Sequence, residues 1–177
     1  MPGTTMLKKS FATDASWALL LVRFPLGLDM FVHGAMKITN IPGTMRYFDG
    51  LNVPHFFAWL AIIAEFCGGL GLMLGLLSRI AAFGVGITML VAIWLRHLPY
   101  GYLMNWHGAL PFGTEGYEYH TLAIGMALAV MMEGAGAWSV DRAIARRMAA
   151  QGAEEADEVA AGQMEHPSPA SKTGALA

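Results

Sequence analysis

An apolar segment near the start of the chain carries ionisable side chains on one side, and this combination limits the fold more than any other feature. The segment covers residues 16–36, and a membrane-spanning helix needs about 20 residues. At about 100° per residue, four ionisable residues fall within about one third of the helix circumference: Arg23, Asp29, His33 and Lys37. A charge that faces hydrocarbon costs at least about 2.5–3.5 kcal/mol. We therefore expect this stripe to face neighbouring helices that carry polar groups.

The composition is typical of an integral membrane protein. Charged residues make up 14% of the chain, hydrophobic residues 55%, and the mean hydropathy is +0.46, whereas an ordinary soluble domain has about 25% charged residues. The net charge is −2, and basic residues cluster only at the ends of the apolar runs. The sequence therefore has no basic patch of the kind that binds nucleic acid. The single cysteine, Cys67, excludes an internal disulfide and a Cys-x-x-Cys redox pair.

Three further apolar runs follow the first. They cover residues 56–77, 80–95 and 119–132, and each is close to the length of a membrane span. Residues 38–55 read as a loop because of their prolines and glycines. Residues 98–118 read as a long connection whose aromatic side chains suit the membrane–water interface. The sequence thus predicts an all-α, integral membrane four-helix bundle.

Lysine and arginine predict the orientation of this bundle. The side that holds both termini carries six basic residues: Lys8, Lys9, Arg79, Arg142, Arg146 and Arg147. The opposite side carries three: Lys37, Arg46 and Arg96. The positive-inside rule then places both termini in the cytoplasm. We expect a short N-terminal arm over residues 1–14, the membrane domain over 15–142 and a flexible tail over 143–177.

A buried polar seam is expected between the first two helices. Glu65 shares one side of the second helix with small residues such as Gly68 and Gly69, which let another backbone approach closely. We expect Glu65 to pair with Arg23, while Asp29 either joins this pair or is protonated. Two interpretations remain open. The charges only neutralise one another and fix the helix register, or they line a proton path or a site for a quinone or another small molecule.

A second polar cluster is expected near the outer face. The candidate ligand-binding residues there are His33, Lys37, His97, Tyr102, Asn105, Trp106, Glu118 and His120. Imidazoles at one membrane level could contact a quinone carbonyl, exchange protons or ligate haem. Haem is the weaker hypothesis, because no histidine pair has a diagnostic spacing. We expect no metal site, because the cluster lacks the closed ligand set that zinc prefers.

The order and spacing of these residues resemble those of the DoxX family of small bacterial membrane proteins. The similarity covers residues 17–141 and rests on five elements: Arg23-x-x-x-Gly27-x-x-x-Phe31-x-His33-Gly34-x-x-Lys37; Glu65-x-x-Gly68-Gly69 with Gly75 and Arg79; His97-x-x-x-Gly101-Tyr102-x-x-Asn105-Trp106; Gly116-Tyr117-Glu118-Tyr119; and Gly134-x-Gly136-x-Trp138-Ser139-x-Asp141.

The resemblance implies a membrane component of a redox or oxidative-stress system. By that similarity the protein would be a quinone-facing or anchoring subunit that works with a soluble oxidoreductase partner. Whether the chain is itself catalytic stays open, as does homo-oligomerisation. Two other functions remain open: a non-enzymatic scaffold that recruits soluble partners, and a transporter of protons or small solutes. Against transport, the four runs show no obvious internal repeat.

Overall fold

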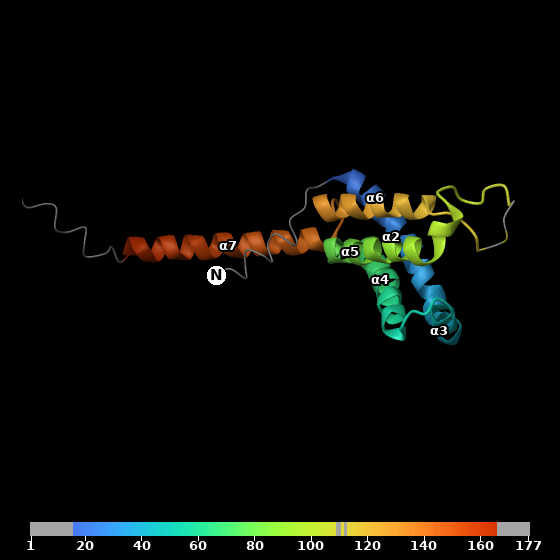
Figure 1. Cartoon of the computed structure of the whole chain (residues 1–177). Helices are drawn as coiled ribbons and strands as arrows, with labels where there is room; N and C mark the ends of the chain where they lie inside the picture. Colours follow the sequence, from blue (N-terminus) through green and yellow to red (C-terminus); the bar gives the residue numbers. More distant parts are fainter. Residues whose placement is uncertain (1–15, 109–110, 112, 166–177) are drawn as a thin grey trace, which may run out of the picture.

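Helices make up most of the described part of the protein. The computed structural model describes residues 16–108, 111 and 113–165, and in these it has six α-helices and no strand (Figure 1). The helices are α2 (Trp17–Thr39), α3 (Ile41–Gly50), α4 (His55–Leu74), α5 (Ser78–Ala92), α6 (Glu118–Glu133) and α7 (Val140–Glu165). A π-helical turn (Ile93–His97) and a 3₁₀ turn (Leu98–Tyr100) extend α5. The all-α prediction is confirmed.

Three of these helical segments are long and apolar enough to cross a membrane. They are Trp17–Thr39, His55–Leu74 and the continuous segment Ser78–Tyr100. Helix α6 has 16 residues, which at 1.5 Å per residue is about 24 Å, shorter than the roughly 30 Å hydrocarbon core. The structure therefore supports a multi-span helical protein with three candidate spans by length.

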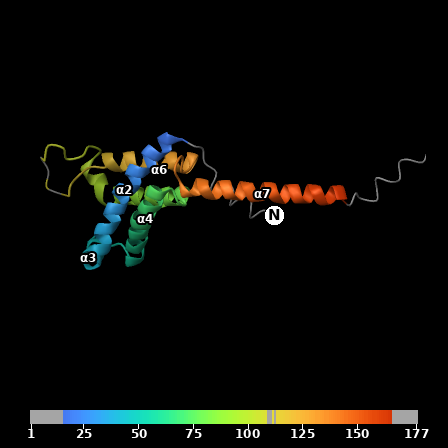
Figure 2. The ribbon, with the colours of Figure 1, turned by 180° about the vertical axis from the view of Figure 1, so that it is seen from behind.

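The helices form two pairs that share one core. Helix α2 packs mainly against α4, α5 packs against both α4 and α6, and α2 also contacts α6. Figures 1 and 2 show α2 and α4 side by side with α3 at their far end, while α7 leads away from the bundle as a single long helix. The core is apolar and is built from α2, α4, α5 and α6, with Met30, Leu72, Val85 and Val130 at its centre.

The bundle has two chemically different ends, which we call the clamp end and the loop end. The clamp end holds the start of α2, the α4–α5 turn and the α6–α7 connection, and backbone hydrogen bonds from Ala137 to Ser16 and from Asp141 to Gly75 join them. The loop end holds α3, the start of α4 and the connection between α5 and α6.

Two segments differ from the expected secondary structure. The expected loop over residues 38–55 contains helix α3, because the Asn40 side chain accepts a hydrogen bond from the Gly43 amide and Pro42 stands in the first turn, where its missing amide hydrogen costs nothing. The segment after residue 142, expected as a flexible tail, is helical up to Glu165. The expected arm over 1–14 and residues 166–177 lie outside the described residues.

Helices α2 and α4 approach each other through glycines. A Cβ added at Gly34 would lie 2.4 Å from the Phe66 amide nitrogen, and one at Gly69 would lie 2.4 Å from the Phe31 nitrogen. The rings of Phe31 and Phe66 stack beside this crossing with centroids 5.0 Å apart. Small residues at such a crossing let two backbones come into direct contact.

Alanine at this crossing is expected to destabilise the bundle. Because the two nearest atoms are the backbone N and Cα of Phe66, which cannot turn aside, Gly34→Ala should force α2 and α4 apart and lower the free energy of unfolding by about 1–3 kcal/mol. The matched control is Gly125→Ala in α6, where an added Cβ meets nothing within 4 Å, so its stability should stay equal or rise. Denaturation by sodium dodecyl sulfate, followed by circular dichroism, measures both variants. Equal stability of the two would contradict this account.

Candidate functional site

The Arg23 side chain closes the clamp end. It is fully buried, and its five N–H groups donate to five main-chain carbonyls. Nε donates to Ala135 at 2.7 Å, Nη1 to Leu72 at 2.6 Å and Met73 at 2.7 Å, and Nη2 to Ala137 at 3.1 Å and Trp138 at 2.7 Å. The last turn of a helix leaves carbonyls without intrahelical partners. Arg23 therefore caps α4 and holds the α6–α7 connection against it.

Other polar residues at the clamp end also bind main-chain groups. The carboxylate of Asp141 accepts from the amides of Leu77 at 2.7 Å and Ser78 at 2.9 Å, which caps the start of α5. Arg79 donates to the carbonyls of Met131 and Met132 at the end of α6. The clamp is thus a set of helix caps supplied by side chains from distant segments, which is a structural role.

The expected ion pair between Arg23 and Glu65 is wrong. The five donors of Arg23 are all used by carbonyls, and Glu65 pairs with Lys37 instead. Leu72, which Arg23 contacts, follows Glu65 on α4 by about 10 Å of helix rise, so the two polar groups lie at different depths. Asp29 does not join either group, because its carboxylate accepts a hydrogen bond from Tyr119. Both predicted buried charges do face the protein interior: Arg23 is 0% and Glu65 4% exposed.

The Lys37–Glu65 pair joins α2 to α4 toward the loop end. Lys37 Nζ donates to Glu65 Oε2, and the two side chains are 24% and 6% exposed. A carboxylate in such a position needs a charged partner, because a lone charge loses its hydration on burial. Lys37 is thus held by Glu65 at one wall of the pocket described next.

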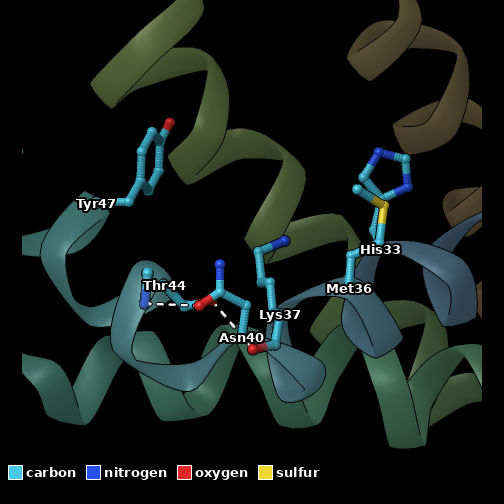
Figure 3. A pocket seen from close by; sticks show the side chains of 7 residues that line it. His33, Met36, Lys37, Asn40, Thr44 and Tyr47 are labelled. Carbon is cyan, nitrogen blue, oxygen red and sulfur yellow. Dashed lines mark hydrogen bonds between the residues drawn. The ribbon is translucent and has the colours of Figure 1, made fainter.

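An open pocket of about 290 Å³ lies between α2 and α3, with Lys37 in its lining. Figure 3 shows the side chains of Lys37, His33 and Tyr47 rising from the two helices toward the same space. Seven residues line it: His33, Met36, Lys37, Asn40, Gly43, Thr44 and Tyr47. We call this space the His33 pocket. Its lining combines methylene and aromatic carbon with the polar groups of imidazole, ammonium, amide and phenol side chains.

Beside the His33 pocket, α2 and α6 meet through a polar cluster. Tyr119 donates to the Asp29 carboxylate, and His33 Nδ1 lies 3.0 Å from the Asp29 carbonyl oxygen. The His97 and His120 rings lie 4.1 Å apart, and Nδ1 of His97 donates to the Glu115 carbonyl at 2.7 Å. His120 is 8% exposed, and its Nδ1 has no hydrogen-bond partner among the described residues. Of these three histidines, His97 and His120 are therefore in contact, whereas His33 contacts Asp29.

Glu118 organises the connection between α5 and α6. Its Oε2 accepts from the indole N–H of Trp106 at 3.0 Å and from the Met104 amide at 3.2 Å. Tyr102, Asn105 and Trp106 line a second open pocket of about 410 Å³. These three residues are therefore grouped together, but in a different pocket from His33 and Lys37.

In the same connection, Glu115 remains anionic. The backbone amides of Glu115 itself and of Gly113 donate to its carboxylate and hold the pKa of this group below its usual value, and the nearby His97 and Arg96 act in the same direction.

Three site residues were missed by sequence reasoning. Tyr119 was overlooked because it stands at the first turn of an apolar run, and Asn40 and Tyr47 because their segment was taken for a loop. The signal for the last two was present in Asn40 followed by Pro42, the usual start of a helix. Within residues 16–108, 111 and 113–165, no group of three histidine, cysteine or carboxylate side chains is placed to hold a metal ion.

The motif residues of both ends fall within or beside a segment that a known family shares. Residues 18–98 match the DoxX family model. These residues belong to the DoxX family. The DoxX segment contains α2, α3, α4 and α5, and with them the His33 pocket, the Lys37–Glu65 pair and Arg23.

Two curated proteins are similar to this chain. The "Inner membrane protein YqjF" of Escherichia coli (strain K12) is 29% identical over 130 residues, which is 73% of this chain and 93% of that protein. The "Putative oxidoreductase CatD" of Bacillus subtilis (strain 168) is 34% identical over 74 residues, 42% of this chain and 55% of that protein. No solved structure matches the chain. Together with the three candidate spans, these similarities identify a multi-pass protein of the bacterial inner membrane.

Proposed function

We propose that this protein is the membrane subunit of a quinone-linked redox system and that a quinone head group binds in the His33 pocket. The chemistry of the pocket carries the proposal. Lys37, Asn40 and Tyr47 bring hydrogen-bond donors to a space of about 290 Å³ at the end of apolar helices, and the His33 imidazole lines the same space. A quinone offers two carbonyl oxygens, which only accept hydrogen bonds, so its head group complements these donors.

The size of the pocket supports binding of a head group alone. Sites for small molecules usually measure about 300–1,000 Å³, and this pocket lies at the lower limit. The isoprenoid tail of a membrane quinone would then lie outside it, against exposed apolar side chains such as Val32 and Met36 on α2. The adjacent Asp29–Tyr119 and His97–His120 contacts provide titratable groups within the same region.

We further propose that α6 is a fourth span, which places both termini in the cytoplasm and the loop end outside. Helix α6 packs along α5 in the core, and a helix about 24 Å long crosses a bilayer that thins locally or where flanking residues complete the span. The distribution of lysine and arginine supports this orientation.

The name of the Bacillus relative as an oxidoreductase supports the redox role. In this proposal electrons come from a soluble oxidoreductase partner, because the described residues hold no group of side chains suited to a metal centre and the chain has a single cysteine. A second candidate is a scaffold that recruits soluble proteins. The observation in its favour is α7, which carries exposed charged residues far beyond the bundle.

Binding of a short-tailed quinone tests the main proposal. Purified protein in mild detergent, titrated with decylubiquinone and with menadione, should show saturable quenching of tryptophan fluorescence. Losing the ring contact in His33→Ala or one hydrogen bond in Tyr47→Phe should weaken binding about three- to tenfold. The control His55→Ala removes a histidine at the same end that pairs with Asp49 and does not line the pocket, so affinity should not change. Absence of saturable binding to both quinones would refute the proposal, and a stoichiometric soluble partner would then favour the scaffold.

A further inference from the structure

Two indole rings stand exposed at the clamp end. Trp17 is 59% and Trp138 79% exposed, and their ring centroids lie 5.8 Å apart. Trp138 has a backbone φ of +50°, a conformation that residues other than glycine rarely adopt. Its carbonyl is held by Arg23. The buried clamp therefore fixes the backbone in a strained state that points a large apolar ring out of the protein. Tryptophan in such a place is typical of the membrane–water interface.

Three arginines follow directly in the first two turns of α7. They are Arg142, Arg146 and Arg147, of which the last two are exposed. The positive end of the helix dipole opposes cations in these turns. No carboxylate among the described residues forms an ion pair with any of the three. Contacts within the part of the chain that the structure describes thus do not account for a basic cluster at this position.

Location identifies what the cluster faces. The clamp joins the start of α2, the end of α4, the start of α5 and the end of α6. With α6 as the fourth span proposed above, α7 therefore starts at the level where these helices leave the membrane. Lipid phosphates lie at this level. The acidic part of α7 begins at Glu154, about 10 Å further along the axis than Arg147, which is about one Debye length.

We propose that Trp17, Trp138 and the three arginines form a binding site for the head group of an anionic phospholipid. The guanidinium groups bind the phosphate, for which their planar N–H pairs are suited. The indoles contact the glycerol and upper acyl region of the lipid. A free phosphate ion lacks these groups, so the site should prefer the lipid. The acidic part of α7 is repelled by the same lipid layer, so the helix leads away from the membrane. This inference does not depend on quinone binding.

Short-chain lipids test the site on the full-length protein in neutral detergent. Fluorescence of Trp138, taken as the difference between the protein and its Trp138→Phe variant, should respond to dihexanoyl phosphatidylglycerol at a concentration at least tenfold lower than to dihexanoyl phosphatidylcholine. Replacing all three arginines by glutamine should weaken binding by about fivefold for each charge removed. Added salt should weaken binding in the unchanged protein.

A matched variant and a competitor complete the experiment. Glu154→Gln with Glu155→Gln and Glu158→Gln changes the same number of charges on the same helix and should keep the affinity for phosphatidylglycerol. If the triple arginine variant fails to fold, Arg146→Gln with Arg147→Gln, at two exposed positions, replaces it. Equal affinity for the two lipids, or unchanged binding after loss of the arginines, would overturn the proposal. Displacement of the lipid by an equal concentration of inorganic phosphate would overturn the assignment to a lipid.

Discussion

Arg23→Gln is expected to remove most of the stability of this protein. The guanidinium satisfies five main-chain carbonyls, of which those of Leu72, Ala135 and Ala137 are buried and the other two are partly buried. A glutamine amide has two N–H groups, so at least three carbonyls lose their donor. Each buried acceptor without a partner costs about 1–3 kcal/mol, which gives a loss of about 3–9 kcal/mol. Domains are stable by only about 5–15 kcal/mol. We expect little folded protein after purification.

Arg23→Lys separates hydrogen bonding from charge. Lysine keeps the positive charge but offers three donors in place of five, so it should lie between the glutamine variant and the unchanged protein. Arg46→Gln, at an exposed position on α3, controls for removal of an arginine and should leave stability unchanged. Size-exclusion profiles and unfolding in sodium dodecyl sulfate provide the measurements. A glutamine variant within about 1 kcal/mol of the unchanged protein would show that water or lipid replaces the guanidinium.

Lys37→Met should be the next most damaging change. It leaves the Glu65 carboxylate, 4% exposed, without its cation. Removing one partner of a buried pair costs about 3–5 kcal/mol, whereas replacing both by apolar side chains is often close to neutral. Lys37→Met with Glu65→Leu should therefore recover most of the loss. Unfolding of the single and double variants shows whether the loss of stability comes from the unpaired carboxylate or from lost packing of the lysine side chain. A double variant as unstable as Lys37→Met would mean that packing of the lysine stem, and not the unpaired charge, determines stability.

The orientation of the charged residues could be predicted from the sequence, but their partners could not. Burial of Arg23 and Glu65 follows from the cost of exposing a charge to hydrocarbon, and both are buried. Pairing was then predicted between the two opposite charges at similar depth. In the structure the partners of Arg23 are main-chain carbonyls. Because every residue has one, the residue types in the sequence do not show which carbonyls Arg23 binds.

The loop end shows the same limit in another form. That the imidazoles of His97 and His120 lie at one end follows from the positions of the helix ends, and their rings are in contact. The donors of the His33 pocket depend on α3, whose start at Asn40 and Pro42 was read as a turn because the same residues open turns and cap helices. The close approach of α2 and α4 at Gly34 was indicated by small residues, but which glycines meet depends on the crossing of the two axes.

The clamp has a consequence for how the protein is made. Three acceptors of Arg23 belong to residues at least 112 positions later in the chain. At about 5–20 residues per second, the ribosome reaches them roughly 6–20 s after it has added Arg23. During that time the first helix enters the bilayer with a guanidinium whose final acceptors do not yet exist. Biogenesis therefore requires that the insertion machinery or local water shelter this one side chain until translation reaches the last turn before α7.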